Sequence, residues 1–287
     1  MDKKFTITID ERLQGKTVKE ILRREYRCSA SILTELKQKE NGILLSKKPV
    51  FVTQRVNVGD VLSVWIKDEG STMEATEIPL TILYEDEDII AINKPREMPT
   101  HPSPKHYGDT LANGLMYYFK GERFTFRAIT RLDKDTSGVV LVAKNPLSAA
   151  ILVEDMKNGK IEKEYMAITN GAPNPPKGKI IAPIARKENS ILLREVSKMG
   201  KEAITEYETV KEENGLALVK LHPITGRTHQ LRVHLSHIGT PIYGDDLYGA
   251  PQKGEKTRLH CSSISFTHPD TRVLMKLQAP ISEDMDV

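Results

Sequence analysis

The stretch R131-L-D-K-D-T-S-G-V-V-L-V-A-K144 contains a charged segment, a turn and a strand, in that order. Asp135-Thr-Ser-Gly138 is typical of a tight turn, because Asp, Ser and Gly each favour turn conformations. The apolar run Val139–Val142 predicts a strand that is buried inside the protein. Asp133 stands just before this turn, which already has an aspartate of its own. The stretch therefore predicts a core strand whose entry turn fixes the position of a second carboxylate.

The residues alone leave two roles open for Asp133. It can accept hydrogen bonds from the backbone of the turn, as aspartate commonly does. It can also be a catalytic carboxylate, aimed into a cleft by the turn that follows it. The rest of the chain has to decide between these two interpretations.

The composition is that of an ordinary globular protein. The chain has 287 residues, of which 39% are hydrophobic and 28% charged, enough for one large domain and one small one. No apolar run approaches the length that crosses a bilayer, and the first ten residues lack an apolar signal core. Cys28 and Cys261 are too far apart in sequence to suggest a disulfide framework. We expect a reduced, cytoplasmic protein with no membrane association.

The positive charge is concentrated at the N-terminus. Residues 1–70 contain 14 Lys/Arg and 10 Asp/Glu, whereas the remaining 217 residues contain 28 and 29. Such an excess is found on solvated lysine-rich surfaces, and also on small nucleic-acid-binding modules that neutralise phosphates.

The N-terminal quarter also has the pattern of a separate unit. Residues 11–40 show apolar positions at helical spacing, and strands are expected at Ile43–Leu45 and Val61–Ile66. The polar, aperiodic residues 68–77 follow as a linker. We therefore divide the chain into residues 1–70, a small α/β module, and residues 71–287, a larger domain.

The larger domain is expected to have an α+β fold with a mixed, largely antiparallel central sheet and flanking helices. Short strands, such as residues 89–93, alternate with Gly- and Pro-rich breaks. Helical patterns are few, at residues 109–119, 146–158 and 229–238.

The helix predicted at residues 229–238 follows from apolar spacing. Leu231, Leu235 and Ile238 recur on one face, and Thr228 is a candidate N-cap. Arg232 is adjacent to a core-facing position, so we expect it to be partly buried and to require a carboxylate partner.

Metal and nucleotide sites are not indicated. His229, His234 and His237 on this helix are spaced five and three apart, whereas the zinc-helix pattern needs four with an acid between them. No Gly-rich phosphate loop occurs. A serine hydrolase is not excluded by composition, but Ser137 lacks the Gly-x-Ser-x-Gly context of that class. We expect no metal and no small-molecule cofactor.

Tyr165 lies in the alternating segment K163-E-Y-M-A167, which predicts a strand. A strand tyrosine is commonly a core residue with a satisfied hydroxyl. It can equally line a cleft and offer its ring to a nucleic-acid base.

Taken together, several motifs resemble the RluA-type pseudouridine synthases, and the resemblance covers roughly residues 78–270. The matching segments are R131-L-D-K-D-T-S-G138, K163-E-Y165, G226-R-T-H-Q-L-R-V-H-L235, Ile92-Asn-Lys-Pro95, His101-Pro102 and Gly239-Thr-Pro-Ile-Tyr-Gly-Asp245. The resemblance implies the pseudouridine synthase fold and an isomerase that converts uridine in ribosomal RNA or tRNA to pseudouridine without a cofactor. Residues 1–70 resemble, more weakly, the small S-four-like RNA-binding module that often precedes this domain.

The resemblance also implies roles for individual residues. It makes Asp133 the nucleophile, Tyr165 the residue that packs on the target uracil, and Arg232 the partner of the aspartate. Arg131 is implied to enter the RNA stack where the base leaves. The expected RNA-contacting residues are Arg131, Thr130, Lys94, His101, Arg227 and His229.

Two positions depart from the pattern of the family. Thr130 stands where many members have histidine, which affects the expected RNA contacts more than the chemistry. Ser46-Lys-Lys48 replaces an Asn-Gly type turn in the N-terminal module, which weakens its expected RNA role.

The chemistry implied by the resemblance suits these residues. A carboxylate can form a covalent intermediate, as in glycosidases, and a uridine within a helix must be flipped out to reach it. Whether Asp133 attacks the ribose or the uracil ring, and which base removes the proton at C5, stay open. The expected partner is large-subunit ribosomal RNA or tRNA, and a monomer is expected. An RNA chaperone without turnover and a metal- or serine-dependent hydrolase are the alternatives.

Overall fold

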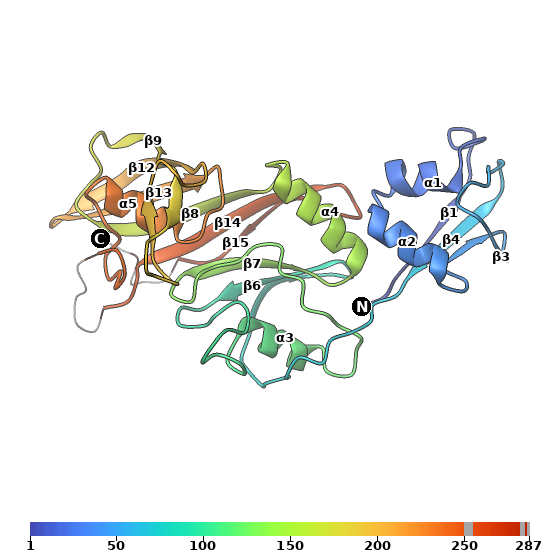
Figure 1. Ribbon diagram of the computed structural model, residues 1–287, viewed down its shortest axis with the longest axis horizontal. Coiled ribbons are helices and arrows are strands. Elements are labelled where there is room, and N and C mark those ends of the chain that lie inside the picture. Colours follow the sequence, from blue (N-terminus) through green and yellow to red (C-terminus); the bar gives the residue numbers. More distant parts are fainter. Residues whose placement is uncertain (250–254, 282–284, 286–287) are drawn as a thin grey trace.

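The computed structural model describes residues 1–249, 255–281 and 285, and the chain forms two units joined along helix α4 (Figure 1). The first unit is a small antiparallel sheet of strand order β1-β4-β2-β3, covered by short helices. Its elements are β1 (Lys3–Thr8), α1 (Val18–Glu20), the π-helix η1 (Ile21–Glu25), α2 (Ala30–Gln38), β2 (Ile43–Leu45), β3 (Lys48–Pro49) and β4 (Val61–Ile66). The strands predicted at residues 43–45 and 61–66 are confirmed, whereas β1 was not predicted.

The second unit is built on a nine-stranded sheet of order β5-β6-β7-β14-β8-β13-β12-β9, with β15 paired to β14. Its strands are β5 (Thr81–Glu85), β6 (Ile89–Lys94), β7 (Ser137–Ala143), β8 (Glu162–Asn170), β9 (Lys177–Ile181), β12 (Ile204–Glu213), β13 (Leu216–Pro223), β14 (Leu259–Thr267) and β15 (Leu274–Gln278). A separate hairpin pairs β10 (Ile184–Arg186) with β11 (Arg194–Val196). Only β7 and β14 run parallel among the described strand pairs, so the predicted mixed, largely antiparallel sheet is confirmed.

All seven residues of strand β7 are buried, because this strand lies inside the sheet, between β6 and β14. Its partner β14 approaches very closely at Gly138, where an added Cβ would lie 2.2 Å from the carbonyl oxygen of Cys261. Gly138 also has φ +111°, a conformation that side chains disfavour. Glycine at this position therefore permits the parallel pairing of the two central strands.

Three helices accompany the sheet: α3 (Leu111–Tyr118), α4 (Pro146–Lys157) and α5 (Gln230–His237). The three helical predictions are confirmed to within two residues at each end. The predicted cap of α5 is wrong, because the N-cap is His229 in the left-handed conformation, without a side-chain cap hydrogen bond. The segment before the helix is held instead by the side chain of Gln230, whose amide oxygen accepts hydrogen bonds from the Arg227 N–H and the Thr225 hydroxyl.

The two units share apolar packing and buried ion pairs. Leu147 and Ile151 of α4 belong to the apolar cluster of the first unit. Arg27 donates to both carboxylate oxygens of Asp155 at 2.9 and 2.7 Å. The fully buried carboxylate of Asp68 pairs with the N-terminal ammonium and with Arg127. These contacts hold the first unit firmly against the second.

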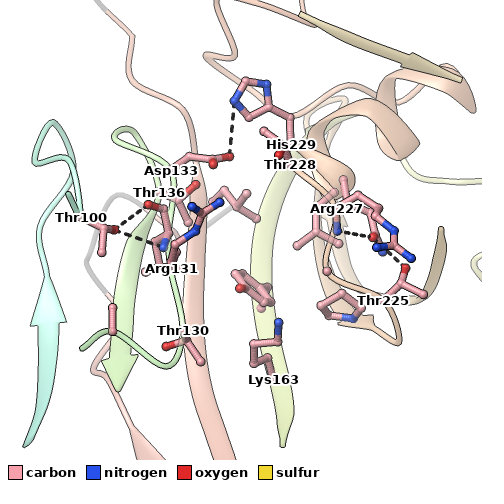
Figure 2. A pocket seen from close by; sticks show the side chains of 18 of the residues that line it. Thr100, Thr130, Arg131, Asp133, Thr136, Lys163, Thr225, Arg227, Thr228 and His229 are labelled. Carbon is pink, nitrogen blue, oxygen red and sulfur yellow. Dashed lines mark hydrogen bonds and ion pairs between the residues drawn. The ribbon is translucent and has the colours of Figure 1, made fainter. Parts of the chain in front are cut away.

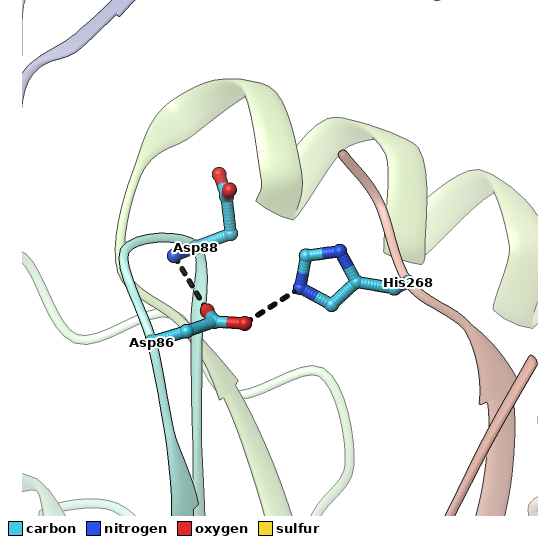
Figure 3. Close-up of side chains that lie close together, drawn as sticks. All are labelled: Asp86, Asp88 and His268. Carbon is cyan, nitrogen blue, oxygen red and sulfur yellow. Dashed lines mark hydrogen bonds and ion pairs between the residues drawn. The ribbon is translucent and has the colours of Figure 1, made fainter. Parts of the chain in front are cut away.

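A further contact between the units involves the acidic cluster shown in Figure 3. Lys3 of β1 donates to Asp88 at 2.8 Å, and Ser148 and Asn145 donate to the other oxygen of that carboxylate. Asp86 accepts from His268 at 2.8 Å. The carboxylate oxygens of Asp88 are therefore occupied by donors of the protein.

In the described part of the chain, no helix has both the length and the apolar character needed to traverse a bilayer.

Candidate active site

A cleft of about 940 Å³ opens beside the N-terminal end of β7, between the turn that precedes this strand, strand β8 and the segment that leads into α5 (Figure 2). It brings together segments that are distant in sequence. Eight of the nine predicted site residues line this cleft, namely His101, Thr130, Arg131, Asp133, Tyr165, Arg227, His229 and Arg232.

The turn at Asp133 is held through its backbone. The Thr136 N–H donates to the Asp133 carbonyl at 3.1 Å, closing the turn. The Thr100 hydroxyl donates to the Leu132 carbonyl at 2.8 Å and accepts from the Leu132 N–H at 3.3 Å. The carboxylate of Asp133, with a side chain that is 33% exposed, is left accessible from the cleft.

Lys94 does not line the cleft, and its predicted contact with RNA is wrong. Its side chain is 0% exposed, and its ammonium donates to the carbonyls of Pro95, Met98 and Lys134 at 2.8, 2.8 and 3.2 Å. Burial lowers the pKa of Lys94 to about 7, against the opposing charges of Asp133 and Asp135. Through its hydrogen bond to the Lys134 carbonyl, Lys94 instead connects the end of β6 to the backbone immediately after Asp133.

Arg232 is buried as predicted, but its partner differs from the one expected. Within the described residues its guanidinium pairs with Asp245, through two hydrogen bonds of 2.7 Å, and with Asp246 at 3.3 Å. Burial lowers the pKa of Arg232, but Asp245 and then Asp133 more than compensate, and the pKa is raised overall. The charge of Arg232 thus faces the same cleft as Asp133, without a direct ion pair between them.

Figure 2 shows the imidazole of His229 next to the carboxylate of Asp133, joined to it by a dashed line. Its Nε2 lies 4.0 Å from the Asp133 Oδ2, and its Nδ1 lies 2.7 Å from the Tyr248 hydroxyl. Burial lowers the pKa of His229, and the charge of Asp133 opposes this shift.

Tyr165 and Lys163 lie on β8 and face the cleft together. Burial raises the pKa of Tyr165 well above its usual range, and the neighbouring Cys261 and the charge of Asp133 act in the same direction. The phenol is therefore protonated at neutral pH. Burial lowers the pKa of Lys163, whose ammonium lies close to Gly226 on the facing wall.

The remaining predicted residues form the walls of the cleft. Arg131 is exposed and has no hydrogen bond or ion pair within the described ranges. Thr130 is buried, and its hydroxyl accepts from the Leu141 N–H at 3.0 Å, so it faces β7. Arg227 donates to the Glu202 carbonyl at 2.8 Å. Burial and then the charge of Arg131 lower the pKa of His101.

The cleft has a cationic lining that suits a polyanion. Six of its residues are Lys or Arg, against the two acids Asp133 and Glu162. The six are Arg131, Lys134, Lys157, Lys163, Arg227 and Arg232. Clefts lined mainly by one sign of charge concentrate ligands of the opposite sign.

Sequence reasoning missed four residues that shape this site: Thr100, Lys163, Asp245 and Tyr248. Asp245 and Lys163 stand inside motifs quoted for the resemblance, so their position in those motifs was an available signal. Thr100 and Tyr248 act through hydrogen bonds to residues 32 and 19 positions away, and no local pattern in the sequence indicates such contacts.

Comparison with known proteins places this geometry in a family. The profile described as "RNA pseudouridylate synthase" matches residues 88–237. An uncharacterized RNA pseudouridine synthase of Bacillus subtilis (strain 168) is 37% identical over 266 residues, which cover 91% of this chain and 94% of that protein. The ribosomal large subunit pseudouridine synthase D of Haemophilus influenzae is 35% identical, over 80% of this chain and 76% of that protein.

A solved structure supports the same relationship. Human RNA pseudouridylate synthase domain containing 4 matches with a TM-score of 0.59 and 28% identity, over 71% of this chain and 90% of that one. The matched family segment runs from the start of β6 to the end of α5, and it includes the turn at Asp133, strand β8 and the helix that carries Arg232.

Proposed function

Since the chain belongs to the RNA pseudouridine synthase family, whose members isomerise uridine in RNA to pseudouridine, we propose that Asp133 is its nucleophile and large-subunit ribosomal RNA its substrate. The observation that carries the first part is the position of Asp133, on a backbone-held turn inside a cationic cleft. The relatives named as ribosomal large subunit enzymes favour the second part over tRNA.

The proposed reaction takes place on a flipped-out uridine. The target base leaves the RNA stack, stacks on the ring of Tyr165, and Arg131 fills the vacated space. Arg131 suits this role because it is exposed at the cleft and, within the described residues, bound to no other side chain. Asp133 attacks the nucleotide, the N1–C1′ bond breaks, and the uracil turns and forms a C5–C1′ bond. The C5 proton is lost to solvent, N1 gains a proton, and the carboxylate of Asp133 is released. No atoms are gained or lost, so the reaction requires no cofactor.

The electrostatics of the cleft suit a negatively charged RNA. Arg232 faces the same space as Asp133, and its guanidinium is paired with the buried Asp245 and with the mostly exposed Asp246. His101 and Arg227 are proposed to contact the RNA around the target. The expected RNA contact of His229 is not proposed, because both of its ring nitrogens face protein side chains.

We also propose that residues 1–70 form an RNA-binding module and that the enzyme is a cytoplasmic monomer. The first unit has its own sheet and apolar cluster and an excess of basic residues. Its turn at residues 46–48 presents two exposed lysines, Lys47 and Lys48, at the outer edge of the sheet.

Tritium release tests the proposed activity and the proposed substrate together. The protein is incubated with large-subunit ribosomal RNA or tRNA, each carrying uridine tritiated at C5, and isomerisation releases the label to water. We expect release from the ribosomal RNA. Release from tRNA alone would reject the proposed substrate, and absence of release from either RNA would favour an RNA-binding protein without turnover.

A further inference from the structure

Two hydrogen bonds and one longer contact lead from outside the cleft to Asp133 through Tyr248 and His229. The backbone N–H of Arg194, at the start of β11, donates to the Tyr248 hydroxyl oxygen at 2.9 Å. The same hydroxyl lies 2.7 Å from Nδ1 of His229. On the far side of the imidazole ring, Nε2 lies 4.0 Å from Oδ2 of Asp133.

The direction of the second hydrogen bond follows from a count of donors and acceptors. A backbone N–H can only donate, so the Tyr248 oxygen accepts from Arg194. A phenol oxygen can accept a second time, but its own proton would then lack an acceptor among the described residues. The hydroxyl proton then has Nδ1 of His229 as its acceptor among the described residues. A neutral imidazole has one protonated nitrogen and one acceptor nitrogen. Accepting at Nδ1 therefore leaves the proton of His229 on Nε2, the nitrogen that faces Asp133.

The backbone and the packing keep His229 in this orientation. The residue adopts φ +56° and ψ +18° at the N-cap of α5, a conformation that histidine tolerates better than most residues. Its side chain is 8% exposed, and its ring meets the Tyr248 ring edge to face, with centroids 5.6 Å apart. The ring is therefore fixed by its backbone on one side and by Tyr248 on the other.

Other charged groups also act on this histidine, and the hydrogen bond to Tyr248 is separate from them. Arg232, Arg194 and Asp245 all influence His229 through their charges, in addition to Asp133. The guanidinium of Arg232 also lies 5.3 Å from the centre of the Tyr248 ring. The ring of Tyr248 thus supports Arg232, whereas its hydroxyl acts on His229 alone among the side chains described.

From this arrangement we propose that Tyr248 is a positioning residue, whose hydroxyl fixes His229 as the Nε2–H tautomer and so directs a hydrogen-bond donor at the nucleophile. The inference rests on the proposed role of Asp133. The donor approaches the carboxylate when RNA closes the cleft, since catalytic hydrogen bonds are commonly long in the free enzyme and shorten in the complex. It then restrains the carboxylate in one orientation.

The test removes the hydroxyl and leaves the ring. Tyr248→Phe should lower the single-turnover rate of tritium release by about 10- to 100-fold, as for other residues that orient a reacting group, with the RNA dissociation constant changed less than twofold. Tyr243→Phe is the matched control, because its ring lies against the guanidinium of Arg258 at the same centroid distance of 5.3 Å and is outside the cleft lining. This control should keep the wild-type rate.

A spectroscopic readout separates positioning from a general structural role. In protein labelled with ¹⁵N at histidine, His229 should show a protonated Nε2 and an unprotonated Nδ1, and Tyr248→Phe should increase the Nδ1–H form. In a His229→Gln background, where the side-chain amide has no such tautomers, Tyr248→Phe should cause no further loss of rate.

Three results would overturn the proposal: an unchanged rate in Tyr248→Phe, an equal loss in Tyr243→Phe, or a His229 tautomer that the substitution does not alter. Wild-type protein that releases no tritium would instead reject the proposed function. The ¹⁵N spectra would still decide the contact between Tyr248 and His229, so the two failures are distinguishable.

Discussion

Asp133 owes its position to backbone contacts, because Thr100, Thr136 and Lys94 all bind main-chain atoms of the turn rather than the carboxylate. This separation has a consequence for substitution. A side chain of the same shape at position 133 should leave the turn intact, since none of these three contacts uses the carboxyl group.

Asp133→Asn should therefore abolish turnover while leaving the fold and the affinity for RNA nearly unchanged. The amide is a far weaker nucleophile than the carboxylate, and loss of a nucleophile lowers rates by about 10⁴-fold or more. Single-turnover tritium release, thermal unfolding and filter binding measure the three quantities. A variant with a rate within tenfold of the wild type would contradict the assignment of Asp133 as nucleophile.

The residues that sequence reasoning placed well are those whose role depends on local pattern. Asp133 and Tyr165 stand beside a turn and on a strand that the sequence indicates, and both line the cleft. Lys94 and Arg232 were placed in the right region with the wrong partners. Their partners are carbonyl groups and Asp245, and a choice between nearby acceptors depends on three-dimensional distances that a sequence does not contain.

At the scale of the elements, helices α3, α4 and α5 were predictable from their apolar spacing, although the N-cap expected for α5 at Thr228 was wrong. Asn145 and Pro146, for example, form a conventional helix start at α4. Strand β1 was not recognised, because its alternation is interrupted by charged residues such as Lys3, which is buried and paired with Asp88 and Asp270. The order of the strands in the large sheet also depends on pairings far apart in sequence.

The close approach of β14 to β7 at Gly138 leads to a prediction about stability. Gly138→Ala should destabilise the protein by about 2–5 kcal/mol, of which about 1–2 kcal/mol reflects the positive φ and the rest overpacking against Cys261. Urea unfolding measures the difference. Gly121→Ala is the matched control, because Gly121 also has a positive φ, +95°, but no atom within 4 Å of an added Cβ. Equal costs at the two positions would show that the close approach of β14 is unimportant.

At the scale of the whole molecule, the ion pairs of Asp68 between the two units make the free energy of unfolding depend on pH. Burial raises the pKa of Asp68, but hydrogen bonds from Arg127 and the N-terminal ammonium outweigh burial and lower the pKa below its ordinary value of 3.8. A carboxyl whose folded pKa is depressed contributes stability above its unfolded pKa and loses it as the pH falls through the folded value. The contribution of Asp68 is therefore complete near neutral pH and is lost progressively below about pH 4.

Asp68→Asn should cost about 3 kcal/mol at pH 7, as for other buried pairs that lose one partner, and should flatten the stability profile below pH 4. Asp270→Asn is the control, because Asp270 also pairs with a lysine of the first unit but has a side chain that is 57% exposed. Its cost should stay below about 1 kcal/mol. Urea unfolding across pH measures both variants, and a profile with the wild-type slope for Asp68→Asn would reject the linkage.

The proposed RNA-binding module leads to a prediction about how the affinity for RNA depends on salt concentration. Replacing Lys47 and Lys48 by glutamine should weaken RNA binding and reduce the slope of log K against log salt by about 0.9 for each phosphate that the protein no longer neutralises. Lys276→Gln, at an exposed lysine of β15, should leave the slope unchanged. Titrations of RNA at several salt concentrations give the slopes, and an unchanged slope in the double variant would exclude this turn from the RNA-binding surface.

The shared packing along α4 has a consequence for which uridines the enzyme can reach. Strand β3 and helix α5 lie toward opposite ends of the long axis of the molecule (Figure 1), and buried apolar and ionic contacts join the two units between them. An RNA held at both places must span that length in one conformation. The separation between its two points of attachment, and not the bases alone, would then select the nucleotide that enters the cleft, so that RNAs with the right sequence but a shorter or longer span would be poor substrates.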